Sequence, residues 1–294
     1  MATSANRWPN SQSIAPWLFL LPALLMFAVY VIIPIIQTIW LSFFHWDGLS
    51  PHKLFVGLAN YRELLVSDEF KTSLLNNIRW LVLYMLAPVI GLAIALYLNQ
   101  QVRGMRLVKS LFFFPFVLSL VVVGLVFSWF YDPHFGLLAH LLGFGIPVLS
   151  NPDYATYGII LAGLWPQIAY CMILFLTGLN NVDQEQIEAA TLDGASGWVM
   201  FRHIILPQLK PATFIAVVVT VIGALRSFDL IAVMTSGGPF GSSYVLAYAM
   251  YEESIVNFRY GYGAALAVVL FAIMLVYIAW FLWRMLRDER RGPL

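Results

Sequence analysis

The chain has 294 residues, of which 61% are hydrophobic and only 11% are charged, and its mean hydropathy is +0.81. A soluble globular protein carries roughly 25% charged residues, so this composition excludes that class and indicates a membrane protein. The net charge of +1 comes with no basic run, which argues against a nucleic-acid partner, and the one cysteine excludes an intramolecular disulfide.

Six segments are apolar over the roughly 20 residues that a helix needs to cross the hydrocarbon core of a bilayer. They are too long and too uniformly apolar for the strands of an outer-membrane barrel. The sequence therefore predicts one all-α integral membrane domain over residues 1–294, built as a bundle of six transmembrane helices. The expected spans are about 17–43, 73–98, 110–131, 156–178, 212–234 and 262–285.

Lysine and arginine in the loops predict the orientation, because positively charged loops stay in the cytoplasm. Ten of these residues lie on one side of the six spans: Arg7, Arg103, Arg106, Lys109, Arg202, Lys210, Arg284, Arg287, Arg290 and Arg291. Four lie on the other side: Lys53, Arg62, Lys71 and Arg259. Both termini, and the loop between the fourth and fifth spans, are therefore expected in the cytoplasm.

That loop, at about 181–211, is polar, broken by glycine and ended by proline. Asp183 can cap a short helix, and Gln186 can reach back to the backbone amide of Asp183. Asp193 and Gly194 are expected to end the helix, because glycine adopts the left-handed conformation that terminates helices. Two interpretations fit this pattern: a docking element for a cytoplasmic partner, or an ordinary connecting loop.

A second helix is expected after the glycine, with Ser196 as its cap. Its large apolar residues recur at helical spacing, as they do on a helix at the membrane interface: Trp198, Phe201 and Ile205. Pro207 and Pro211 are expected to stop this helix and to restart the chain as the fifth span.

Two stripes of small and polar residues lie on single helix faces near the middle of the membrane. In the fourth span the stripe is Gly163, Gln167 and Tyr170. In the fifth span it is Thr220, Gly223, Ala224 and Ser227. The stripes predict either a candidate substrate path between the two helices or tight helix packing, for which small residues are equally typical.

Three charged residues lie within spans, where each costs about 2.5 to 3.5 kcal/mol near the bilayer centre. Arg226 and Asp229 are three residues apart and predict a pair on one helix face, as a gate or structural element or as a substrate contact. Arg79 can extend its guanidinium towards the interface, and its role stays open. No spacing of histidine, cysteine and carboxylates predicts a metal site or a catalytic set, so no enzymatic activity is expected.

Ten residues at fixed spacing over twenty positions resemble the EAA signature of binding-protein-dependent ABC importer permeases: Glu188, Ala189, Ala190, Asp193, Gly194, Ala195, Phe201, Ile204, Leu206 and Pro207. Further segments resemble the carbohydrate-type subfamily that includes maltose and glycerol-phosphate permeases: 42–48, 55–61, 112–119, 228–239 and 261–271. The short N-terminus departs from the maltose-like layout, which more often has an extra first span, and favours the compact glycerol-phosphate, lactose or oligosaccharide layout.

The resemblance implies a type I ABC importer permease fold with a cytoplasmic coupling helix between spans four and five. Its ATPase-coupling residues would be Glu188, Ala189, Ala190, Asp193, Gly194, Ile204, Leu206 and Pro207. The implied partners are a cytoplasmic ABC ATPase dimer, a second permease subunit and an extracytoplasmic binding protein, all at the cytoplasmic (inner) membrane. The implied cargo is a sugar, an oligosaccharide or a polyol phosphate.

The chain contains no Gly-Lys dipeptide and hence no phosphate-binding loop, so ATP and Mg are expected on a separate ATPase and no cofactor on this chain. The alternative function is an ion-coupled secondary transporter of a small polar solute. It predicts ionisable relay residues in several spans and internal repeats, whereas the sequence has one intramembrane acid and no repeat.

Overall fold

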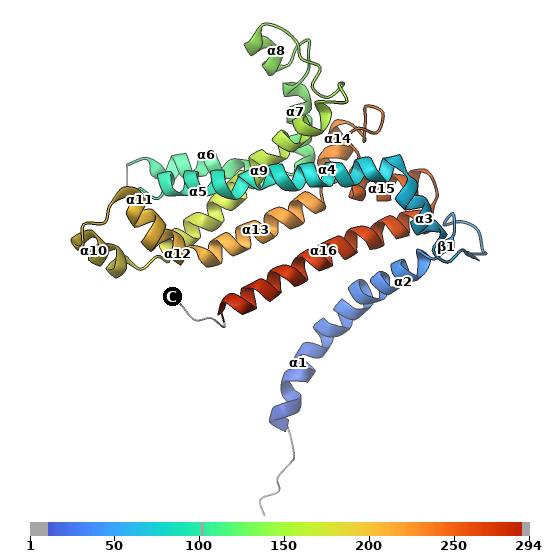
Figure 1. The fold of residues 1–294 in the computed structure, drawn as a ribbon, viewed down its shortest axis with the longest axis horizontal. Coiled ribbons are helices and arrows are strands. Elements are labelled where there is room, and N and C mark those ends of the chain that lie inside the picture. Colours follow the sequence, from blue (N-terminus) through green and yellow to red (C-terminus); the bar gives the residue numbers. More distant parts are fainter. Residues whose placement is uncertain (1–10, 101–102, 290–294) are drawn as a thin grey trace, which may run out of the picture.

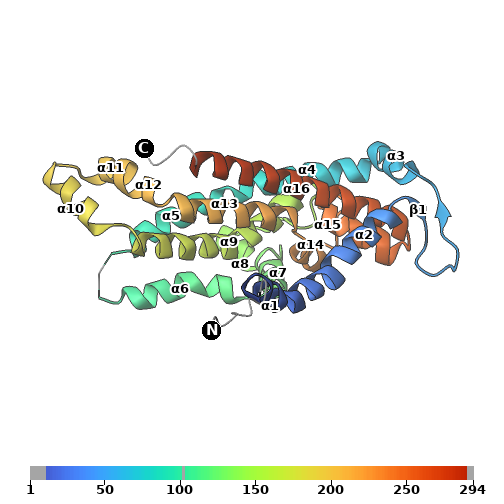
Figure 2. The same cartoon turned by 90° about the horizontal axis from the view of Figure 1, so that it is seen from below.

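The computed structural model describes residues 11–100 and 103–289, which form an elongated bundle of helices (Figure 1). The long helices run side by side between two ends, as the second view also shows (Figure 2). One end carries α10 (Gln184–Leu192) and is called the loop end. The other carries α3 (Ala59–Val66) and is called the hairpin end. Three of the basic residues used to predict the orientation lie outside the described residues: Arg7, Arg290 and Arg291.

Four helical rods among the described residues are long and apolar enough to cross a membrane, and six do so if each of two bent pairs counts as one span. Helices dominate because every backbone N–H and C=O in lipid must be hydrogen-bonded within its own segment. The four rods are α1 (Ser11–Phe27) with η1 (Ala28–Ile32) and α2 (Ile33–Leu41), α4 (Asp68–Tyr84) with α5 (Leu86–Leu98), α9 (Ala155–Asn180), and α16 (Tyr260–Glu289).

The span predicted at 110–131 is not one continuous helix: this segment is two helices at 99° to each other, α6 (Met105–Val117) and α7 (Leu120–Phe130). Pro115 lies in the last turn of α6 and has no N–H to continue the hydrogen-bonding pattern. The backbone is extended at the break, and the Ser119 hydroxyl accepts a hydrogen bond of 3.3 Å from the Val122 N–H, which starts α7.

The predicted span at 212–234 is also interrupted. Helix α13 (Lys210–Leu225) ends, and α14 (Asp229–Met234) begins only after three intervening residues. Arg226 is the first residue of this break and Asp229 is the first residue of α14, so the two charged residues of the predicted pair do not share a helix. The consequences for that pair are described with the site below.

Short elements close the hairpin end and one side of the bundle: β1 (Phe44–His45) paired antiparallel with β2 (Leu54–Phe55), α8 (Leu137–Leu142), α15 (Leu246–Tyr251) and η3 (Glu252–Val256). The loop that precedes α15 is held by α4. Asn76 Nδ2 donates to the carbonyls of Ser242 and Tyr244 at 2.7 and 2.8 Å, and Asn77 Oδ1 accepts from the Leu246 N–H at 2.9 Å. Both asparagines are buried, so this loop is fixed to the bundle.

The central packing contact is between α5 and α9, which contribute Ala87, Ala95 and Phe175 to the buried core. A Cβ atom added at Gly91 would lie 2.7 Å from the Cβ of Cys171 and 2.8 Å from the backbone nitrogen of Met172. Only glycine therefore allows the two helix backbones to approach this closely. Cys171 itself is a buried free thiol.

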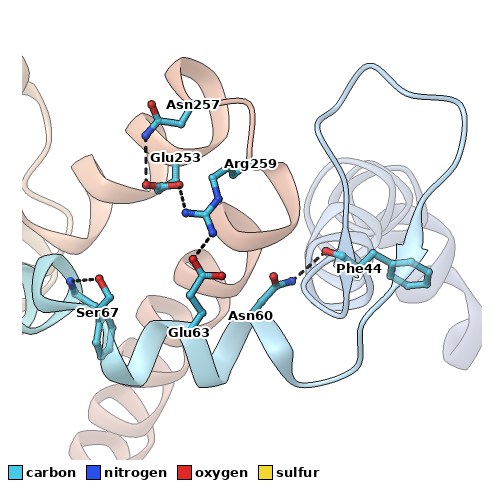
Figure 3. A network of polar contacts seen from close by, with 8 residues as sticks. Phe44, Asn60, Glu63, Ser67, Glu253, Asn257 and Arg259 are labelled. Carbon is cyan, nitrogen blue, oxygen red and sulfur yellow. Dashed lines mark hydrogen bonds and ion pairs between the residues drawn. The ribbon is translucent and has the colours of Figure 1, made fainter.

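A polar network ties α3, η3 and the start of α16 together at the hairpin end (Figure 3). Arg259 Nη1 lies 3.1 Å from Oε2 of Glu253, and its Nη2 pairs with the Glu63 carboxylate. Asn257 donates to the other oxygen of Glu253 at 3.2 Å. Burial opposes the charge on Arg259, but the hydrogen bond that Arg259 donates to Glu63 and the charge of Glu253 raise the pKa of Arg259 above its ordinary value. The carboxylate side chain of Glu253 is only 7% exposed, so it depends on this arginine.

We expect Arg259→Met to lower the free energy of unfolding by about 2 kcal/mol, because it leaves the buried Glu253 carboxylate without its cation. The double variant Arg259→Met with Glu253→Gln should recover part of that loss, since the carboxylate is then removed as well. Thermal unfolding of the purified chain in detergent measures both values. Equal stability of the single and double variants would show that the pair does not hold this end together.

Candidate functional site

The exposed helix α10 at the loop end begins at the predicted cap. Asp183 Oδ1 accepts a hydrogen bond of 3.0 Å from the Glu185 N–H, and α10 starts at the next residue after the cap. Gly194 has φ +85° and follows the helix end, which confirms the predicted left-handed turn. The Ala195 N–H returns to the Ala190 carbonyl at 2.9 Å and closes that turn.

The predicted contact of Gln186 with the backbone amide of Asp183 is wrong. Gln208 Oε1, from α12 (Leu206–Gln208), accepts from that amide at 2.9 Å. The Gln186 amide instead donates to Asp183 Oδ2 at 3.2 Å and accepts from Gln208 Nε2 at 3.2 Å. We call these three residues the amide clasp. It joins the start of α10 to the helix that leads into α13.

The helical segment after the glycine turn ends between Pro207 and Pro211, as predicted. It runs through α11 (Gly197–Met200), η2 (Phe201–Ile205) and α12 without stopping at Pro207, and it bends by 71° into α13. Pro207 lies inside this helical run, two residues after η2, and does not end it. Ser196 precedes α11, but its side chain does not cap it.

The predicted coupling residues divide into exposed and packed groups. The exposed residues form the outer surface of the loop: Glu188, Ala189, Asp193, Gly194 and Pro207. The packed residues are buried or half-buried: Ala190, Ile204 and Leu206. The exposed group thus leaves a carboxylate beside a small-residue surface on a fixed, capped helix, which another protein can approach closely.

A cavity of about 440 Å³ lies between α4, α6, α9, α13 and α14. It is lined by most of the residues predicted for a substrate path and by both residues of the predicted pair: Gly163, Gln167, Tyr170, Gly223, Ser227, Arg226 and Asp229. Thr220 and Ala224 do not line it, because both are fully buried behind its wall. The two stripes are nevertheless in contact, because Gln167 Nε2 of the first donates a hydrogen bond of 2.9 Å to Thr220 Oγ1 of the second.

Four aromatic residues of the cavity wall did not figure in the predicted path: Trp80, Tyr84, Phe116 and Phe228. Phe116 stacks on Tyr170 with ring centroids 5.0 Å apart and planes 12° apart. The four aromatic residues come from segments that are far apart in the sequence: α4, α6 and the break between α13 and α14. No periodicity within one segment could have identified them.

The predicted pairing of Arg226 with Asp229 on one helix face is wrong. Within the described residues neither side chain takes part in an ion pair, because the helix is interrupted between them. Both are exposed and both line the cavity. Arg79 lies elsewhere: its Nη1 donates to Asn76 Oδ1 at 2.9 Å, and its guanidinium lies 5.7 Å from the centre of the Tyr157 ring.

In residues 11–100 and 103–289, no group of three or more His, Cys, Asp or Glu side chains is arranged to hold a metal ion. The site therefore consists of two parts: a cavity with polar and aromatic walls among membrane-length helices, and a capped helix outside them on a loop joined to α13. Together these features define a multi-pass membrane permease.

Comparison with known proteins identifies the kind of permease. Residues 72–287 match the family described as the binding-protein-dependent transport system inner membrane component, and the chain belongs to this family. A probable ABC transporter permease protein of Pyrococcus horikoshii is 37% identical over 281 residues, which cover 93% of this chain and 96% of the relative. The trehalose/maltose transport system permease protein MalF of Thermococcus litoralis is 32% identical over 264 residues, covering 88% and 89%.

A solved structure has the same fold: a bacterial alginate ABC transporter in complex with an alginate pentasaccharide-bound periplasmic protein. The TM-score is 0.79 at 19% identity, over 92% of this chain and 93% of the matching chain. The type I importer permease fold expected from the sequence is thereby confirmed. In the present chain this fold includes the break between α6 and α7 and the break between α13 and α14.

Proposed function

We propose that this chain is the membrane subunit of an ABC importer that carries a sugar or related carbohydrate into the cytoplasm. An extracytoplasmic binding protein would deliver the cargo, and two cytoplasmic ATPase subunits, which bind ATP and Mg, would drive its passage. The names of the trehalose/maltose relative and of the alginate transporter support the carbohydrate class. The periplasmic protein bound to the alginate transporter supports the delivery step.

One observation carries this proposal: the exposed loop and the cavity share a continuous piece of chain. The amide clasp joins α10 to α12, and α13 starts two residues after α12 and carries Gly223 into the cavity wall. Movement of α10 by an ATPase would therefore be transmitted to α13. The residues that we assign to this docking are Glu188, Ala189, Ala190, Asp193, Gly194, Ile204, Leu206 and Pro207.

The orientation follows from the same assignment. The charge bias of the loops supports an arrangement in which the loop end and both termini would be in the cytoplasm and the hairpin end would face the binding protein. No residue in the apolar window of the first span is buried within this chain, and only α2 packs on α16, which leaves most of the span's surface for lipid and for a second permease subunit. Family membership favours this machine over an ion-coupled secondary transporter.

Purification through a tag on this chain tests the assembly. An ATPase subunit and a second permease should elute with the tagged chain from detergent-solubilised membranes. The variant Glu188→Lys should reduce the ATPase in the eluate while the second permease remains. Elution of the chain without any ATPase would contradict the proposal.

We expect Gln208→Ala to lower ATP-driven uptake about fivefold, because α10 loses its link to α12 and a hydrogen bond contributes about 1 kcal/mol. Gln186→Ala should lower uptake as well. Uptake by the double variant should be only slightly lower than uptake by either single variant, because each of the three variants disrupts the same amide clasp. Uptake and ATP hydrolysis are measured side by side in proteoliposomes. Additive losses would indicate that the two glutamines act separately.

A further inference from the structure

The wall of the cavity contains a polar group that is not used by a hydrogen bond among the described residues. Tyr84 is only 6% exposed, and its side chain lines the cavity from α4. A Cβ atom added at Gly163 would overlap the Tyr84 hydroxyl, so the missing side chain of this glycine makes room for that hydroxyl. Among the described residues, no hydrogen-bond partner is found for it. Because Tyr84 lines the cavity, its hydroxyl is free to donate a hydrogen bond to a group bound there.

A hydrogen-bond acceptor lies across a small gap from Tyr84. Thr220 holds Nε2 of Gln167 at 2.9 Å, which leaves Oε1 of the same amide free to accept. The position of an added Cβ at Gly223 is 3.7 Å from this oxygen and 4.0 Å from Cε1 of Tyr84. The surface of Gly223 is therefore an open spot between the tyrosine and the amide carbonyl. A hydroxyl group placed there can accept from Tyr84 and donate to Gln167.

The rest of the lining suits an uncharged ligand. Its two charged residues, Arg226 and Asp229, have opposite signs and are both exposed, so the lining has no net charge. A bound phosphate or carboxylate would need a positive charge in the cavity that is not balanced by a negative one. The positive charge of Arg226 is balanced by the negative charge of Asp229. The stacked rings of Phe116 and Tyr170 instead offer a flat apolar surface to the C–H face of a sugar ring.

We propose that Tyr84, Gln167 and Gly223 form a subsite for a hydroxyl group of a neutral sugar, so that the cargo is a neutral sugar and not a polyol phosphate. This inference rests on the proposed carbohydrate import and narrows it to one chemical class. Tyr84 supplies the donor, Gln167 the acceptor and Gly223 the space. The phenol and the amide need only rotate slightly to bind different hydroxyls.

Uptake by the complete transporter, reconstituted with its binding protein, tests the cargo class. One probe is a radiolabelled mixture of neutral hexoses, pentoses and glucose oligomers, and the other is labelled sn-glycerol 3-phosphate mixed with glucuronate. We expect ATP-driven uptake of the neutral mixture alone. Uptake of the anionic mixture alone would overturn the neutral subsite and leave carbohydrate import standing, whereas uptake of neither mixture would overturn both.

Two variants test the residues. Tyr84→Phe removes only the hydroxyl, and Gly223→Ala fills the open spot with a methyl group that meets its neighbours at ordinary contact distances. Each should lower neutral-sugar uptake about tenfold. Tyr157→Phe is the matched control, because this exposed tyrosine does not line the cavity, and its uptake should equal that of the unchanged protein. Unchanged uptake by Tyr84→Phe would overturn the inference.

A labelling experiment separates binding from packing. In Gly223→Cys the new thiol lies in the cavity, while the native Cys171 is buried. A methanethiosulfonate reagent should modify the new thiol in the assembled transporter, and the neutral mixture should slow the reaction several-fold while the anionic mixture does not. A reaction rate that neither mixture changes would show that Tyr84 and Gly223 serve only to pack the helices.

Discussion

Replacing Gly194 with valine is expected to reduce ATP-driven uptake roughly tenfold while the chain still inserts into the membrane. Gly194 has φ +85°, a conformation that costs other residues about 1 to 2 kcal/mol and β-branched residues more. No atom lies within 4 Å of an added Cβ, so the side chain itself meets no obstacle. The backbone would change instead, and α10 would no longer be held in its present direction relative to α11.

The matched control is Gly194→Asn, because asparagine tolerates the left-handed conformation and the position has room for it. It should retain most of the uptake. Both variants are assayed for uptake and for ATP hydrolysis in proteoliposomes, with the valine variant expected to hydrolyse ATP without matching transport. Equal uptake by the two variants would mean that the turn does not determine coupling.

The variant Gly91→Leu is expected to prevent stable folding, with a loss of about 3 kcal/mol or more in the free energy of unfolding. The added Cβ alone would lie 2.8 Å from the backbone nitrogen of Met172, which cannot move aside as a flexible side chain could. Helices α5 and α9 would have to separate along the largest helix contact of the bundle. The cavity wall formed by α9 would move with them.

Ala93→Leu provides the comparison, because Ala93 lies two residues away on the same helix and is exposed. The added side chain would face lipid or a neighbouring subunit at little cost. Thermal unfolding in detergent and the amount of folded chain in the membrane measure both variants. Similar stability of the two would refute the close approach of the helix backbones at Gly91.

The sequence predicts the long helices well where hydropathy alone decides their extent. The spans expected at 156–178 and 262–285 correspond to α9 and α16, which are slightly longer at both ends. It does not predict the breaks within 110–131 and 212–234, because apolar residues on both sides of each break keep the average hydropathy of the segment high. A hydropathy pattern records which residues enter the membrane but not a change in backbone direction such as the one at Ser119.

The same distinction applies to the site. Helical spacing placed Gly163 and Gln167 on one face, and the structure places both on the cavity wall. Local pattern also identified the Asp183 cap and the Gly194 turn. Tyr84 could not be found in this way, since its importance comes from a glycine on another helix. Gln208 was missed for a similar reason: it replaces a contact that Gln186 was expected to make within its own helix.

The most direct measurement is uptake of the neutral sugar mixture by proteoliposomes that contain the complex purified through this chain. ATP supplied on the side of the loop end should drive accumulation against a gradient, and uptake should stop when ATP is withheld or when Gly194→Val replaces the native chain. An ion gradient should have no effect. Sugar uptake that continues without ATP and follows a proton or sodium gradient would contradict the assignment of this chain to an ATP-driven importer.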